Sequence, residues 1–244
     1  MDNYLDIKRI IDEAENIVFF GGAGVSTDSG IPDFRGSDGL YNDSEDIDEA
    51  PEIILSHNYL LRKPESFYSY YKTHMIYPYA EPNDAHYSLA RLEQAGKLSA
   101  IITQNIDGLH QAAGSQNVIE LHGSVHRNYC VRCGVNHSLS YVLDSEQIPR
   151  CRKCNGMIRP DVVLYGEGLN NEAFSRAEEA VYNADVLIVG GTSLTVHPAS
   201  SLVDTFEGEH LIIINRTPTP YDGYAEFVIR DSIADVLNFL VNDI

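Results

Sequence analysis

The sequence predicts an α/β fold in which helices cover both faces of a doubly wound, parallel sheet. Short apolar runs without polar alternation recur along the chain, and helix-like stretches separate them. Strands that are apolar on both faces are typical of a parallel sheet that is covered on each side. Regular alternation of strands with helices is the pattern of a doubly wound α/β domain.

Each expected element follows from its apolar pattern. Residues 4–15 place Leu5, Ile7 and Ile11 near helical spacing, with charged residues between them. The apolar runs expected to form strands are residues 17–20, 100–103, 118–121, 186–189, 211–214 and 227–229. Further helices are expected at about 84–95, 171–183, 198–206 and 231–241.

Two segments interrupt this alternation. Residues 38–76 begin as an acidic loop and become Tyr-rich and helix-like, whereas residues 126–159 hold all four cysteines. We expect these two segments to form a smaller helical and zinc-binding module. The remaining residues, 1–37, 77–125 and 160–244, should then form the larger nucleotide-binding domain.

Composition limits the class of partner. The 244 residues include 17 Lys and Arg against 36 Asp and Glu, a net charge of −19, and 43% are hydrophobic. This apolar fraction excludes a disordered chain, and the excess of acid argues against nucleic acid as a partner. No run approaches the ~18 apolar residues of a membrane span, and residues 1–6 lack the pattern of a signal peptide. We therefore expect a cytoplasmic protein that does not bind a membrane.

The cysteines have the spacing of a zinc ribbon. Cys130 and Cys133 form one C-x-x-C pair, and after 17 intervening residues Cys151 and Cys154 form a second pair. Four thiolates in a tetrahedron satisfy Zn²⁺ and leave no position open, so one structural ion is expected. The alternative is a set of unrelated buried cysteines.

A glycine-rich loop follows the first expected strand. Gly22 and Gly24 match two glycines of a dinucleotide-binding turn, but Thr27 occupies the third position. The glycine N–H groups are candidates for binding a pyrophosphate, and an ordinary tight turn is the alternative. Further along, Phe34 and Arg35 provide an aromatic ring and a guanidinium that suit a phosphate ligand, or else a packed loop with a surface ion pair.

Polar residues follow four of the expected strands, where ligands of doubly wound sheets bind. They are Gln104, Asn105 and Asp107 after one strand, His122 after the next, Thr192 and Ser193 after a third, and Asn215 after a fourth. Each alone is also explained as a helix cap. His122 is the best candidate acid or base because imidazole titrates near neutral pH, and His110 is a weaker one.

Together these motifs resemble those of the sirtuins. The resemblance rests on segments 22–26, 30–36, 103–110, 120–123 and 191–193 with the two C-x-x-C pairs, in family order from about residue 17 to 233. It implies NAD⁺-dependent removal of acyl groups from protein lysines, on a Rossmann-like domain with a smaller zinc module. NAD⁺ would be consumed: nicotinamide leaves, and the acyl group moves to ADP-ribose.

The resemblance also implies roles for individual residues. His122 would be the general base, and Asn105 and Asp107 would line the nicotinamide pocket. The segment 162–167 would pair with the acyl-lysine peptide, with Tyr165 where the family commonly has Phe. The residues expected around NAD⁺ are Ala23, Thr27, Phe34, Arg35, Gln104, Ile106, Asp107, His122, Thr192, Ser193, Asn215 and Ile233, and those expected at the peptide are Val163, Tyr165, Gly166 and Glu167.

Two other functions remain open. An NAD-linked dehydrogenase is disfavoured by the missing third glycine and the cysteine insert, and a non-catalytic NAD⁺ or ADP-ribose sensor is disfavoured by His122. ADP-ribosyl transfer is a minor alternative.

For the acyl group, the resemblance aligns Tyr70 and Thr73 with a Tyr and an Arg that bind acidic acyl chains, while Lys72 lies ~100° away on the helix. We therefore expect neutral acyl groups such as acetyl to be preferred.

Overall fold

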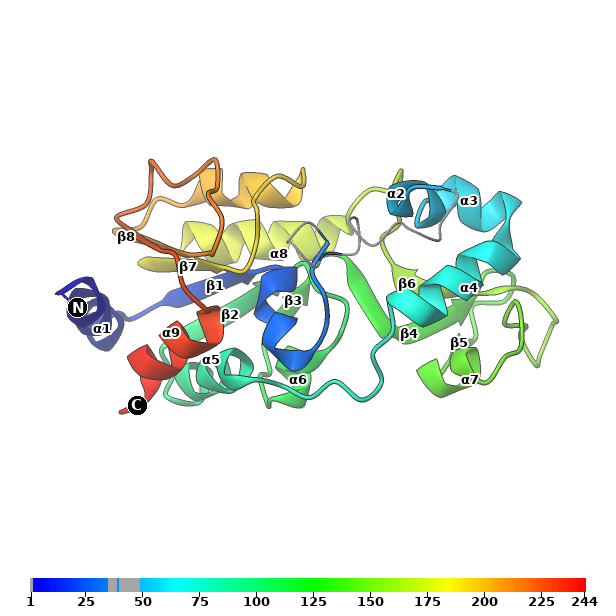
Figure 1. Ribbon diagram of the computed structural model, residues 1–244, viewed down its shortest axis with the longest axis horizontal. Coiled ribbons are helices and arrows are strands. Elements are labelled where there is room, and N and C mark those ends of the chain that lie inside the picture. The colour runs from blue at the N-terminus through cyan, green and yellow to red at the C-terminus, as the bar shows by residue number, and fades with distance from the viewer. Residues whose placement is uncertain (1, 35–38, 40–48) are drawn as a thin grey trace.

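The computed structural model, which describes residues 2–34, 39 and 49–244, contains a six-stranded parallel sheet. The strand order is β3-β2-β1-β7-β8-β9, so the chain winds outward from β1 in both directions (Figure 1). The strands are β1 (Ile17–Gly21), β2 (Leu98–Thr103), β3 (Val118–Glu120), β7 (Val186–Gly190), β8 (His210–Ile214) and β9 (Phe227–Ile229). The predicted fold class is confirmed.

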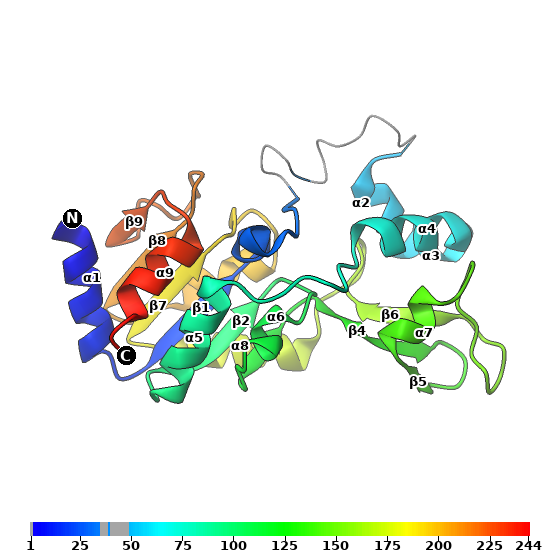
Figure 2. The same cartoon turned by 60° about the horizontal axis from the view of Figure 1, so that its bottom comes forward.

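Helices cover both faces of this sheet. On one face lie α1 (Asp2–Glu13), α5 (Asp84–Gln94) and α9 (Ile233–Val241), and on the other lie α8 (Asn171–Tyr182) and the 3₁₀ helix η4 (Ala199–Thr205) (Figure 2). Neighbouring residues of β1 point to opposite faces. Phe19 packs into the first core and Phe20 into the second, and both are fully buried. The unbroken apolar strand thus reflects a sheet buried on both sides.

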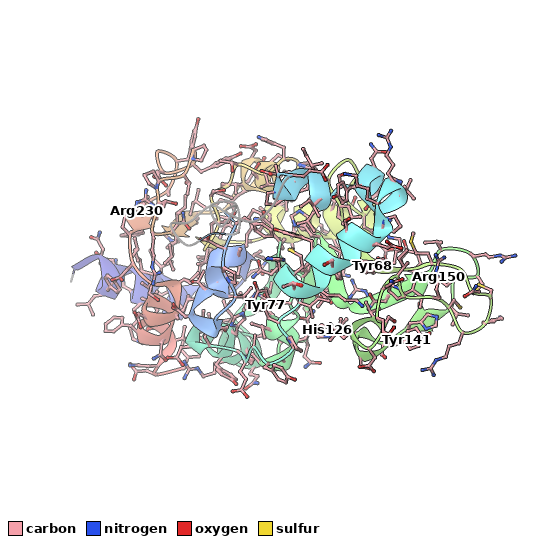
Figure 3. The ribbon with its side chains drawn as sticks, turned by 45° about the vertical axis from the view of Figure 1, so that its right-hand side comes forward. Tyr68, Tyr77, His126, Tyr141, Arg150 and Arg230 are labelled. Atoms are coloured by element: carbon pink, nitrogen blue, oxygen red, sulfur yellow. The ribbon has the colours of Figure 1, made fainter. Side chains whose placement is uncertain are left out.

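The smaller module is built on a three-stranded antiparallel sheet of order β5-β4-β6. Its core includes the Tyr-rich helix, where Tyr68 is buried and its hydroxyl donates to the carbonyl of Ile158 (Figure 3). The elements are α2 (Pro51–Ile54), α3 (His57–Arg62), α4 (Pro64–His74), β4 (Gly123–Cys130), β5 (Asn136–His137), α7 (Leu139–Leu143) and β6 (Ile158–Val162).

The two long strands of the module connect it to the large sheet. Only Leu121 and His122 separate β3 from β4, and the N–H of Val163, just past β6, donates to the carbonyl of His122 at 2.9 Å. The division of the chain into two domains at the expected boundaries stays a prediction. Among the described residues, no helix is both long and apolar enough to cross a membrane.

Candidate active site at the carboxyl edge of the large sheet

Glycines bring the loops after β1 and β7 into direct contact. The N–H of Gly22 donates to the carbonyl of Gly190 at 3.2 Å, and the N–H of Gly24 donates to that of Gly191 at 2.8 Å. A Cβ atom on Gly24 would lie 2.8 Å from the Cα of Gly191, so no other residue fits there. Both glycine N–H groups therefore already have acceptors at the end of β7, and their binding of a pyrophosphate stays a prediction.

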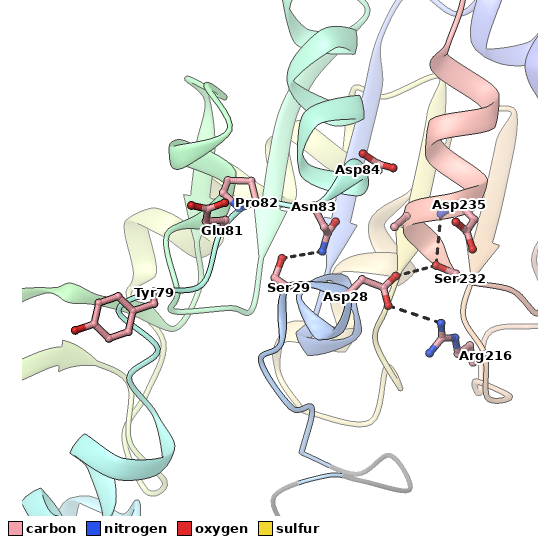
Figure 4. A pocket seen from close by; sticks show the side chains of 11 residues that line it. Asp28, Ser29, Tyr79, Glu81, Pro82, Asn83, Asp84, Arg216, Ser232 and Asp235 are labelled. Carbon is pink, nitrogen blue, oxygen red and sulfur yellow. Dashed lines mark hydrogen bonds and ion pairs between the residues drawn. The ribbon is translucent and has the colours of Figure 1, made fainter.

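Two helix caps support the loop after β1, which contains the 3₁₀ helices η1 (Ala23–Val25) and η2 (Thr27–Ser29). Asn83 caps α5 and also donates to the carbonyl of Val25 at 2.8 Å and to Ser29 Oγ at 2.9 Å. Ser232 caps α9 and donates to Asp28 at 2.9 Å. These groups border an open pocket of about 710 Å³ (Figure 4). The loop is therefore held from outside the sheet.

A chain of hydrogen bonds links this loop to the end of β2. Ser26 Oγ donates to the carboxylate of Asp107 at 2.7 Å and accepts from the amide of Asn105 at 3.1 Å. Burial raises the pKa of Asp107, against the lowering effect of the hydrogen bonds from Leu109 N–H and Ser26. Ser26 is itself buried and was not among the predicted site residues. Its position in the glycine-rich loop is the signal that could have identified it.

His122 follows β3 and lies against the end of β2. Its Nδ1 is 2.9 Å from the carbonyl oxygen of Gln104. A carbonyl can only accept, so Nδ1 carries the hydrogen and Nε2 keeps its lone pair. Burial lowers the pKa of His122, against the raising effect of this hydrogen bond, so the imidazole is neutral near pH 7. The side chain of Gln104 donates in turn to Thr192 Oγ1 at 3.0 Å.

Gly123 permits the turn that places His122. Its φ is +78°, and a Cβ there would lie 2.0 Å from the carbonyl oxygen of Asp161. Only glycine allows β4 to leave the histidine and pair at once with β6. The orientation of the His122 imidazole therefore depends on Gly123, the next residue in the sequence.

The residues expected at the adenosine end lie in different surroundings in the structure. Asn215 follows β8, and its amide donates to the carbonyl of Thr217 at 2.8 Å, while Ser193 Oγ lies 2.8 Å from Thr195 Oγ1. Ile233, by contrast, is buried in the apolar core against Gly190. Phe34 lies at the end of the loop after β1, and Arg35 lies outside the described residues.

The segment expected to bind peptide runs from β6 towards α3. The N–H of Tyr165 donates to the carbonyl of Leu55 at 3.1 Å, and the N–H of His57 donates to the carbonyl of Tyr165 at 3.0 Å. Gly166 follows with φ +87°, a left-handed conformation that turns the chain. The segment is thus bonded to the helical part of the small module.

The four cysteines meet at one end of the small module. The Sγ atoms of Cys130, Cys133, Cys151 and Cys154 all lie within 4.8 Å of one another. Two of the separations are 3.4 Å, for Cys130 and Cys154, and 3.6 Å, for Cys133 and Cys151. A zinc–sulfur bond of about 2.3 Å gives a tetrahedron with edges of about 3.8 Å. The thiols fit zinc, and a Cβ on Gly156 would lie 2.9 Å from the Sγ of Cys130.

The comparisons with known proteins agree with one another. A model of the Sir2 family matches residues 22–198. An NAD-dependent protein deacetylase of Clostridium acetobutylicum is 52% identical over 242 residues, covering 99% of each chain. One from Cutibacterium acnes is 53% identical over 228 residues, covering 93% of each.

Solved structures match over the same length. A complex of a Sir2 homologue with NAD has a TM-score of 0.89 at 38% identity, covering 98% of this chain and 93% of that one. A Sir2 complex with a p53 peptide and NAD⁺ has a TM-score of 0.85 at 37% identity, covering 100% of this chain and 98% of that one. The chain therefore belongs to the Sir2 family of NAD-dependent protein deacetylases.

Proposed function

We propose that this protein removes acetyl groups from protein lysines while consuming NAD⁺, with His122 as the general base. The observation that carries this assignment is the geometry of the His122 ring, which is partly buried and donates its Nδ1–H to the carbonyl of Gln104, while desolvation lowers its pKa. The Nε2 lone pair is then available to take a proton. A general base needs both the unprotonated form and a fixed orientation.

In the proposed reaction, the acetyl oxygen displaces nicotinamide from the ribose of NAD⁺, and the acetyl group ends on ADP-ribose. His122 takes a proton from a ribose hydroxyl whose oxygen attacks the former acetyl carbon, and water then releases the lysine. A related Sir2 structure holds a deacetylated p53 peptide with 3′-O-acetyl ADP ribose, which supports this course. No hydride is transferred, so the dehydrogenase alternative is not needed.

The polar chain around Ser26 is the proposed nicotinamide pocket. A carboxamide both donates and accepts, and Asn105 and Asp107 offer an amide and a carboxylate within one hydrogen-bonded chain. Thr192, Ser193 and Asn215 are proposed to bind the adenosine half. NAD⁺ supplies the electrophilic ribose carbon when bound, whereas the chain provides orientation and the base.

The decisive experiment is to incubate the zinc-loaded protein with NAD⁺ and an acetyl-lysine peptide, and to follow nicotinamide and both products by mass spectrometry. We expect nicotinamide release that requires the acetylated peptide. Release without peptide, or reduction of NAD⁺, would refute the assignment. We also propose a cytoplasmic location, where the four cysteines stay reduced, which cell fractionation tests.

A further inference from the structure

The carboxylate of Glu167 is fully engaged inside the protein. Arg159 donates to it through two nitrogens, at 2.7 and 3.0 Å, and the N–H of Leu164 donates at 2.9 Å. The ring of His57 contributes a fourth contact, with Nδ1 at 2.6 Å from Oε1. The carboxylate thus holds side chains from β6 and α3 and a backbone group of its own segment.

The electrostatics of Glu167 agree with this arrangement. Burial would raise its pKa, but the hydrogen bonds from Arg159, Leu164 N–H and His57 lower it to about 2. Glu167 and Arg159 are 19% and 13% exposed, so water competes little with the paired bonds. The carboxylate is therefore ionised and paired at every pH at which the enzyme would be assayed.

The same contacts determine the shape of segment 163–167. The segment is bonded to His122 at one end and to α3 at Tyr165, and the carboxylate of Glu167 closes it at the other end. Arg159 also donates to the carbonyl of Val162 at 3.0 Å, just before the segment begins. The guanidinium and carboxylate therefore clamp both ends of one short stretch of backbone.

We infer that Arg159, Glu167 and His57 are positioning residues that hold segment 163–167 in the conformation that receives the acyl-lysine peptide. This inference rests on the proposed function. Glu167 acts through its carboxylate on the protein and not on the peptide. Without the clamp the segment samples other conformations, and the affinity for peptide falls by the fraction of molecules that lose the competent one.

The test is the steady-state kinetics of Glu167→Gln, Arg159→Lys and His57→Ala, each with its zinc content measured. Losing one charged partner should raise the KM for peptide by roughly tenfold or more in Glu167→Gln, and by less in His57→Ala. We expect the KM for NAD⁺ and kcat to stay within a factor of about two, because the base and the polar chain at Ser26 are untouched. Arg159→Lys keeps the positive charge beside Glu167. It should therefore lose less affinity for peptide than Glu167→Gln does.

Two comparisons separate positioning from other roles. Arg176→Gln is the matched control, because Arg176 on α8 bonds Asn117 just before β3, at the other end of that strand from His122. In Glu167→Gln, the affinity for acetyl-lysine peptides should fall by the same factor whether the residues next to the acetyl-lysine are basic, neutral or acidic. A loss in Glu167→Gln that depends on peptide charge would show direct contact with the substrate and overturn the inference.

The remaining outcomes are also decisive. His57 is 43% exposed, so His57→Ala should fold even if the change at Glu167 does not. If the wild type is active and the KM for peptide is unchanged in both His57→Ala and Glu167→Gln, this inference is overturned and the proposed function is not. A wild-type protein without NAD⁺-dependent deacetylation overturns the proposed function and this inference with it.

Discussion

Replacing His122 with Ala should lower kcat by ~10²–10⁴-fold while leaving NAD⁺ binding nearly unchanged. This is the usual contribution of a general base, and the geometry fits that role, because the Gln104 carbonyl holds Nδ1–H and leaves Nε2 as the basic atom of the ring. The residues proposed to bind NAD⁺, in contrast, are distributed over the loops after β1, β2, β7 and β8. Deacetylation is followed by mass spectrometry, and NAD⁺ affinity by calorimetry.

The pH dependence tests the same base independently. Only neutral His122 can accept a proton, so kcat should be constant above the pKa of the ring and fall about tenfold per pH unit below it. Burial lowers that pKa from its ordinary value of 6.5, so the midpoint of the acid limb should lie below pH 6.5. The His122→Ala variant should lose this limb from its residual activity.

His210→Ala is the matched control for His122→Ala. His210 begins β8 at the opposite edge of the sheet and lies 2.6 Å from Glu226, so its removal should leave kcat unchanged. Near-normal turnover in a folded, zinc-containing His122→Ala protein would refute the assignment of the base. An acid limb centred above pH 6.5 would refute the argument from burial.

Three further predictions follow from contacts away from the base. Cys133→Ser should abolish stoichiometric zinc binding and lower the thermal unfolding midpoint, because metal affinity contributes to folding; a metal-free variant as stable as wild type would contradict this. Arg230 donates to the carbonyls of Asn215 and Thr217 at 2.9 and 3.1 Å, so Arg230→Gln should raise the KM for NAD⁺ and not that for peptide (Figure 3). The acetyl-lysine version of a peptide should exceed the succinyl-lysine version in kcat/KM by roughly tenfold, since burying an unpaired carboxylate is costly.

The large sheet was predictable because its signal is local. Residues 17–20 and 186–189 are unbroken apolar runs, and both strands are buried on each face. The Tyr-rich helix was harder to place: its period marks a helix, but only the structure shows Phe67 stacked on Tyr71 with ring centres 5.5 Å apart in the core of the small module. What a helix packs against depends on segments that lie far away in the sequence.

The same limit applies to the candidate site. His122 and the polar residues after β2 were named because each directly follows a predicted strand. The roles of Ser26 and His57 depend on contacts across 81 and 110 positions of sequence. The glycine N–H groups show the same limit, since their acceptors, Gly190 and Gly191, lie at the end of β7, far along the sequence. Sequence motifs thus locate the edge of the sheet where the site lies, and the pairing between loops determines which groups remain available.

Lys72 shows how such pairing bears on the choice of acyl group. From the sequence alone, Lys72 is a cation to consider for an acidic acyl chain, because it directly precedes Thr73. In the structure the ammonium group of Lys72 donates to the carbonyls of Ser145 and Gln147, so it joins α4 to the loop after α7. Partial burial lowers the pKa of Lys72, and moving its ammonium group into an acyl pocket would break both hydrogen bonds. Lys72→Ala should therefore leave the acetyl-to-succinyl ratio of kcat/KM unchanged, and a further loss of succinyl activity alone would show that Lys72 reaches the acyl pocket.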